Sequence, residues 1–273
     1  MPNHFQSRVV LTGQIHCKTG AKFNHCSGSA RRRSPDLYSL KDLSGLPYIS
    51  GSNFKNFLRR QVESLLLETL GPGFSCDSFN RDKACIRFDE SKADGGIYLQ
   101  DLLQQSADDD EHLAQLIEKH TCIACKMFGS QLDESQIHAD DLKPAAWSGQ
   151  FNVRKKMSHP EVVQESDDKV PNKYLIRVTL TNCEAWKRGL FIMGLSRAQN
   201  KLITLSTGKQ AEQHIGTIEK LSIRSLESAR QYYECLAHLE ATDGDEVTTE
   251  QLQQWIASLR DYLKLVAGFA LAS

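Results

Sequence analysis

The sequence lacks the features of a membrane protein or a secreted protein. It contains no apolar run approaching the roughly 20 residues that a helix needs to cross a bilayer. Its first residues, Met1 to Gln6, lack the basic and then apolar pattern of a secretion signal. Internal repeats and long low-complexity tracts are also missing. We therefore expect a cytoplasmic protein with no membrane partner.

The chain has almost no net charge, but its charges are unevenly distributed. The formal net charge is -1. Between Arg8 and Arg60, ten Lys or Arg stand against two Asp, whereas between Asp101 and Asp141 ten acidic residues stand against two Lys. The basic stretch coincides with loop and glycine signals rather than with a helix face, which disfavours a merely solvated surface. Such a stretch can follow a phosphate backbone, and the acidic stretch would repel one.

Hydrophobic periodicity predicts an α+β fold. The 273 residues are 40% hydrophobic and 25% charged, which is ordinary for a globular chain with a real core. Strands are expected from Val9 to Ile15 and from Lys173 to Thr181, and a helix from Phe54 to Leu66 with Ser52 or Asn53 as its N-cap. Further extended segments are expected at 147–157, 202–206 and 217–223, and further helices at 111–120, 183–201, 225–239 and 249–265. The order is compatible with a ferredoxin-like sheet that carries helices on one face.

Four of the eight cysteines form a candidate metal site. Cys122 and Cys125 make a C-x-x-C pair, which can hold one side of a tetrahedral ion, and Cys76 and Cys85 can complete it. His120 is an alternative fourth ligand. A closed site of this kind would be structural zinc, and it would fix the insertion at 71–125 to the main body. The alternative is a set of buried free thiols.

A glycine turn directly before the long helix is a candidate phosphate site. The segment from Tyr48 to Lys55 places Gly51, Ser52 and Asn53 at the start of the helix, where backbone N–H groups carry positive partial charge. Lys55 and Arg59 lie on or near one face of its first turns and can hold neighbouring phosphates. An ordinary capped helix with a solvated basic face is the alternative.

Three motifs together resemble the RAMP superfamily of CRISPR proteins, and more narrowly the backbone subunits of type III effector complexes. They are T-G at 19–20, L-P-Y-I-S-G-S-N-F-K-N-F-L-R at 46–59, and C-I-A-C-K-M-F-G at 122–129. Ser50 stands where the family usually has proline, and Asn56 where it often has glycine. The late glycine-rich loop of the family, here 207–216, keeps two glycines.

The resemblance implies an RRM-like, ferredoxin-like core at 1–224, with the zinc-binding insertion at 71–125 and a thumb-like arm at 154–172. A helical C-terminal extension would occupy 225–273. The implied partners are guide (CRISPR) RNA, complementary target RNA and other CRISPR effector subunits. The residues implied in RNA contact are Gly51, Ser52, Asn53, Lys55, Arg59, Arg31, Arg32, Arg33, Arg154, Lys155, Lys156 and Lys209.

The resemblance also raises the possibility of target RNA cleavage. Catalytic members of the family carry an aspartate in the first long loop. This aspartate helps a divalent metal such as Mg²⁺ to promote attack by the 2′-hydroxyl on the adjacent phosphate of the target RNA. Asp36 and Asp42 reproduce the spacing of the two acids in that loop, and Asp36 is our candidate. An alignment on Ser34 and Pro35 would instead put Arg33 at the catalytic position and make the subunit inactive.

Three other functions are weighed against this one. The chain can be a guide-RNA scaffold subunit that does not cleave. It can be a zinc-stabilised adaptor that uses the acidic segment and the C-terminal helices for protein contacts, in which case it would have no affinity for RNA. A guide-processing nuclease of the same superfamily would need a histidine-based acid–base site, which the sequence does not clearly offer.

Overall fold

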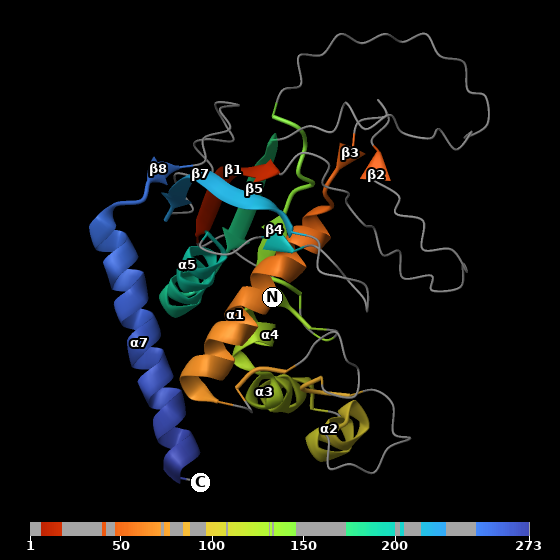
Figure 1. Ribbon diagram of the computed structural model, residues 1–273. Helices are drawn as coiled ribbons and strands as arrows, with labels where there is room; N and C mark the ends of the chain where they lie inside the picture. The colour runs from red at the N-terminus through yellow and green to blue at the C-terminus, as the bar shows by residue number, and fades with distance from the viewer. Residues whose placement is uncertain are drawn as a thin grey trace, which may run out of the picture.

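Figure 1 shows the fold, taken from a computed structural model of the chain. The structure describes residues 7–17, 40–41, 47–71, 74–76, 84–87, 97–107, 109–130, 132, 134–145, 173–199, 203–204, 214–227 and 244–272. No helix within these ranges combines the length and apolar character that crossing a membrane requires.

The centre of the fold is an antiparallel sheet. Its strands are β1 (Arg8–Cys17), β4 (Ile137–Ala139), β5 (Lys173–Thr181), β6 (Ile203–Thr204) and β7 (His214–Leu226), in the order β4-β5-β1-β7-β6, and β8 (Asp245–Glu246) also pairs with β7. Every pairing is antiparallel. A separate small sheet joins β2 (Leu40–Lys41) to β3 (Pro47–Tyr48).

The chain order confirms the ferredoxin-like arrangement. The helices are α1 (Gly51–Leu70), α2 (Leu99–Ser106), α3 (Asp110–His120), α4 (Ile123–Phe128), α5 (Ala185–Gln199) and α7 (Thr249–Ala272). The succession β1, α1, β4, β5, α5, β7 is a βαββαβ unit, and its strands lie in the sheet in the order β4-β5-β1-β7. The predicted α+β class is therefore correct, and it follows from the topology itself.

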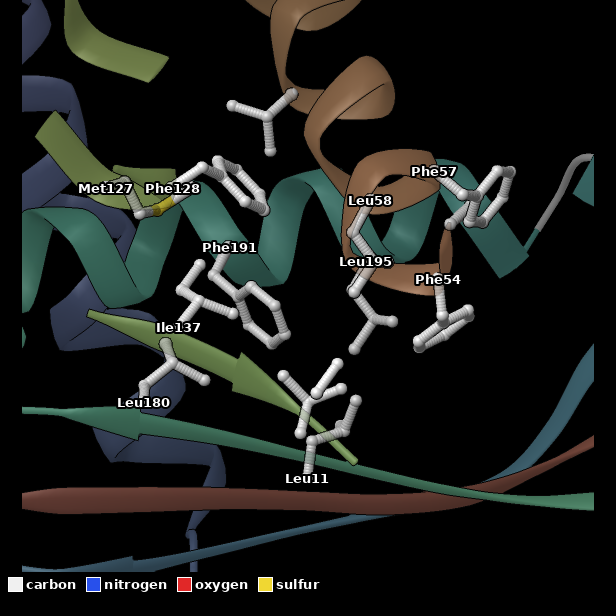
Figure 2. Packing of buried hydrophobic residues seen from close by; sticks show 14 of the residues in the cluster. Leu11, Phe54, Phe57, Leu58, Met127, Phe128, Ile137, Leu180, Phe191 and Leu195 are labelled. Carbon is white, nitrogen blue, oxygen red and sulfur yellow. The ribbon is translucent and has the colours of Figure 1, made fainter. Parts of the chain in front are cut away.

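The core lies between one face of the sheet and the helices α1 and α5. Figure 2 shows Leu11 and Leu180 of the sheet pointing toward Phe191 and Leu195 of α5, with Phe54 of α1 beside them. Along β5 the even-numbered residues from Tyr174 to Leu180 are all buried, as the predicted alternation requires. This packing fixes the position of α1 relative to the sheet.

Helix α7 packs on the outer side of α5 (Figure 1). The two backbones approach closely at Gly189, where an added Cβ would lie 2.2 Å from the carbonyl oxygen of Trp255. Trp255 is buried, and Trp186 stacks on Tyr262 with ring centroids 3.8 Å apart. The C-terminal helix is therefore part of the packed body.

Two predictions at element ends are wrong. The N-cap of α1 is Ser50, whose hydroxyl accepts a hydrogen bond from the Asn53 backbone, and the helix begins at Gly51. The helix predicted at 225–239 begins too early, because Ser225 and Leu226 pair with Val9 and Arg8 as the last residues of β7. Residues 228–239 lie outside the described ranges, and the short helices α2 and α4 were not predicted.

Candidate metal centre and nucleic-acid interface

The four predicted cysteines meet in space. The Sγ atoms of Cys76, Cys85, Cys122 and Cys125 all lie within 4.8 Å of one another. Cys76 and Cys85 place their sulfur atoms 3.4 Å and 3.8 Å from that of Cys125. Within the described residues this is the one group of histidine, cysteine or acidic side chains arranged to hold a metal ion.

Helix α4 sets the geometry of the C-x-x-C pair. Cys122 is its N-cap, and the Cys122 Sγ accepts a hydrogen bond from the Cys125 backbone N–H at 3.5 Å. The backbone N–H of Cys122 donates to the Sγ of Cys85 at 3.2 Å. Ile123 and Met127 are buried in the core and hold the helix in place. The apolar residues of the motif thus anchor the segment that carries the ligands.

The cluster fits a tetrahedral zinc ion. A Zn–S bond of about 2.3 Å corresponds to sulfur atoms about 3.8 Å apart, which is close to the observed separations. Hydrogen bonds from the neighbouring thiols, Cys125 first and then Cys76 and Cys85, lower the pKa of Cys122, and the hydrogen bonds to Cys122 raise the pKa of Cys85 and of Cys125. A thiolate is the form that binds zinc. Sulfur from all four residues makes a closed, structural type of site with no open position.

Arg59, a predicted RNA contact, lies beside the cysteine cluster. Its side chain turns inward, and the residue is only 7% exposed. The guanidinium donates to the Sγ of Cys125 at 2.9 Å, to the Gly129 carbonyl at 2.9 Å and to Glu63 at 2.7 Å. Burial disfavours its charge, but Cys125 and Glu63 outweigh this effect, so the pKa of Arg59 is raised. We therefore assign Arg59 to the cysteine cluster.

The start of α1 is built by close backbone contact with the end of β4 and the residue that follows it. A Cβ on Gly51 would lie 1.9 Å from the carbonyl oxygen of Ala139, so only glycine fits here. The Gly51 N–H donates to the Asp141 carboxylate at 2.8 Å, and the Asn53 N–H donates to Ser50. Two of the N–H groups expected to face a phosphate thus have partners within the chain.

The side chains at this helix start are open to solvent to different degrees. Ser52 is exposed, whereas Asn53 and Lys55 are half-buried. Burial and, to a smaller extent, the charge of Arg59 lower the pKa of Lys55. Lys55 and Ser52 can therefore contact a ligand from outside through their side chains, without the backbone amides.

A surface hollow lies beside the same helix start. It measures about 510 Å³ and contains both charge signs, with Asp140 within 3.2 Å of His138 and 3.6 Å of Arg177. Its lining residues are His138, Ala139, Asp140, Asp141, Lys143, Leu175 and Arg177. Sequence reasoning missed it, because its residues come from two segments that only the sheet brings together.

Several predicted site residues lie outside the described ranges. They are the candidate catalytic Asp36, the alternative Asp42, and the basic residues Arg31, Arg32, Arg33, Arg154, Lys155, Lys156 and Lys209. The thumb-like arm at 154–172 also lies outside them. These assignments stay predictions from the sequence.

Comparisons with known proteins give structural similarities only. No family model matches the sequence, and no curated protein matches it. A chain of the Csm3–Csm4 subcomplex in the type III-A CRISPR-Cas interference complex is 14% identical, with a TM-score of 0.45 and coverage of 94% of this chain and 97% of that chain. Csm3 from Methanopyrus kandleri is 13% identical, with a TM-score of 0.46 and coverage of 95% and 98%. Csc2 from Thermofilum pendens is 11% identical, with a TM-score of 0.38 and coverage of 97% and 90%.

Proposed function

We propose that this chain is a guide-RNA-binding backbone subunit of a type III CRISPR effector complex. The observation that carries the proposal is the place of the G-S-N-F-K motif, which the structure puts at a strand-to-helix turn beside a ferredoxin-like sheet. The resemblance of this motif to the RAMP superfamily implies contact with the guide backbone at this turn. The four-cysteine cluster, to which the third motif contributes Cys122 and Cys125, supports the same resemblance.

The proposed RNA surface differs from the one the sequence suggested. Ser52, Asn53 and Lys55 supply side chains to the guide backbone, and Gly51 allows the turn to sit close to the sheet. Arg59 is left out because it is buried at the cysteine cluster. The basic residues predicted from the sequence extend the surface: Arg31, Arg32, Arg33, Arg154, Lys155, Lys156 and Lys209. Target RNA and other effector subunits are the proposed partners.

RNA affinity and its salt dependence test this role. Fluorescence anisotropy with single-stranded RNA should show binding that weakens steeply with salt, because phosphate contacts release counterions. Lys55→Ala should weaken binding and reduce the slope of log K against log salt by about 0.7, the value for one phosphate contact on a single strand. Lys264→Ala on α7, which pairs with Asp261, is the matched control and should change neither quantity. Wild-type protein with no affinity for RNA would support the adaptor function instead.

We further propose that the four cysteines hold one structural zinc ion. When bound, the ion cross-links α4, which is packed in the core, to the segments that carry Cys76 and Cys85. Elemental analysis of the purified chain should give one zinc per chain. Cys76→Ser should remove it, whereas Cys183→Ser, at a buried thiol outside the cluster, should leave it. Wild-type protein without zinc, or retention of zinc by Cys76→Ser, would contradict the site.

Cleavage of target RNA is the second step of the proposal. We propose that Asp36 is the catalytic residue of a Mg²⁺-dependent cleavage in the assembled complex. This assignment rests on the spacing between Asp36 and Asp42 in the sequence. Asp36→Ala should abolish cutting at one or more sites while RNA binding persists, and Asp42→Ala is the matched comparison. The cut pattern is read on labelled target RNA with and without magnesium. An unchanged pattern would make the subunit a guide-RNA scaffold that does not cleave.

A further inference from the structure

Arg59 connects two parts of the chain that are distant in sequence, the helices α1 and α4. From α1 its guanidinium reaches Cys125 within α4 and Gly129 at the end of α4, at 2.9 Å each. Its Nε donates to Glu63 one turn further along α1, at 2.7 Å. The guanidinium thus holds both the cysteine and the last carbonyl of the helix that carries the C-x-x-C pair.

The end of α4 is shaped to present that carbonyl. Gly129 is the C-cap of the helix, with φ at 84°, a conformation that favours glycine. Its N–H donates to the Cys125 carbonyl at 2.9 Å, which closes the last turn. The Gly129 carbonyl accepts the hydrogen bond from Arg59. The F-G end of the motif therefore has a specific partner on α1.

The charge of Arg59 is buried together with the charge of Glu63. Its side chain is 8% exposed and that of Glu63 15%, so both charges are largely removed from water. A buried cation is costly unless it is paired and hydrogen-bonded. A zinc ion held by four thiolates carries net negative charge, because the thiolates outnumber the charges of the ion. The Cys125 sulfur brings this negative charge directly to the guanidinium.

We propose that Arg59 is a positioning residue of the metal centre. It orients Cys125 for the ion, offsets the negative charge of the thiolates and ties α1 to α4. The inference rests on the proposed zinc site and extends it. Since Lys55 lies one helical turn before Arg59, occupancy of the metal site also steadies the turn of α1 that is proposed to meet RNA.

Zinc release tests this role directly. The full-length wild type is compared with Arg59→Met, Arg59→Lys and Arg60→Met, the last at the exposed neighbouring arginine. Loss of a partner hydrogen-bonded to a ligand typically costs about 10–100-fold in metal affinity. Arg59→Met should weaken zinc binding to a competing chromophoric chelator by this factor. Arg59→Lys should recover part of the loss, because an ammonium keeps the charge but cannot reach all three partners. Arg60→Met should match the wild type.

Cobalt spectroscopy separates this role from a purely structural one. Co²⁺ in place of zinc gives sulfur-to-metal charge-transfer absorption, which responds to hydrogen bonds on the thiolates. The band should shift in Arg59→Met and keep its wild-type position in Arg60→Met. Wild-type zinc affinity and an unshifted band in Arg59→Met would overturn the inference and leave the zinc site standing. A wild type that binds neither metal would overturn the zinc site itself, and the role of Arg59 with it.

Hydrogen exchange on the wild type tests the link between the metal site and α1 without any substitution, so it does not depend on a variant that folds. Hydrogen exchange of the amides of α1 is followed in the zinc-loaded and the chelated protein. Protection near Arg59 should fall on chelation, while that of β5, which contributes no residue to the cluster, should fall less. Equal losses in α1 and β5, or no loss in either, would overturn the link between the metal site and α1.

Discussion

At the scale of single residues, Gly51 shows how tightly α1 is docked against the sheet. The Ala139 carbonyl occupies the space that any side chain at position 51 would need. Gly51→Ala should therefore destabilise the fold by about 1–3 kcal/mol, the usual cost of overpacking. Urea unfolding measures this free energy.

Gly268→Ala is the matched control for that substitution. Gly268 lies in α7 and has nothing within 4 Å of an added Cβ. Replacing glycine by alanine in an open helix position should stabilise the fold by up to about 1 kcal/mol. If Gly51→Ala proved as harmless as Gly268→Ala, the close approach of α1 to the end of β4 would be incorrect.

The contacts that Arg59 and Asp141 make could not be predicted from the sequence. Each is a charged residue with a charged neighbour in the sequence, and such a local sequence is typical of solvent-exposed side chains. Their partners are far along the chain: Cys125 is 66 residues from Arg59, and Gly51 is 90 residues from Asp141. No local spacing rule reports such contacts. The cysteines were predicted because metal coordination demands their chemistry wherever the chain brings them.

At the scale of elements, the contact between α5 and α7 buries the large side chain of Trp255. Trp255 is 5% exposed, and the guanidinium of Arg188 lies 5.2 Å from its ring centroid. Trp255→Ala should cost about 3–5 kcal/mol of unfolding free energy, as for other buried aromatic residues. Leu265→Ala on the same helix, at a side chain 59% exposed, should cost less than about 0.5 kcal/mol. Similar costs for the two would contradict the packing of α7 on α5.

The elements themselves were largely predictable where their apolar pattern is strong. Phe54, Phe57, Leu58, Val62, Leu65 and Leu66 were expected on one helix face; five of them are buried, and Leu65 is half-buried. The strand at 173–181 has the predicted bounds and alternation. Errors arose where distant contacts decide the structure. β7 runs on to Leu226 because β1 is available to pair with it, and Ser50 caps α1 in place of Ser52.

At the scale of the whole molecule, the cysteine cluster joins parts of the chain that the sheet does not hold. With zinc about 1,000-fold above its Kd, binding should stabilise the folded chain by about 4 kcal/mol. Removing the metal with a chelator should therefore lower the Tm, as followed by circular dichroism.

The cysteine variants supply the controls for that measurement. Cys85→Ser should unfold at the same temperature with and without chelator, because it lacks a ligand. Cys183→Ser should keep the difference seen in the wild type, since Cys183 lies outside the cluster. A wild-type Tm that did not respond to the chelator would show that the four thiols contribute to stability without an ion.

The carboxylate of Asp141 at the start of α1 has a consequence for ligand selection. It is tethered next to the Gly51 amide, so it competes with any dissolved anion at a high effective concentration. A lone phosphate ion or a mononucleotide would have to displace it to reach that amide. A polymer needs no such displacement, because many weak contacts to exposed side chains such as Ser52 add up along its length. The Asp141 carboxylate thus disfavours the binding of small anions at the helix start, whereas a long polyanion can still bind there through the exposed side chains.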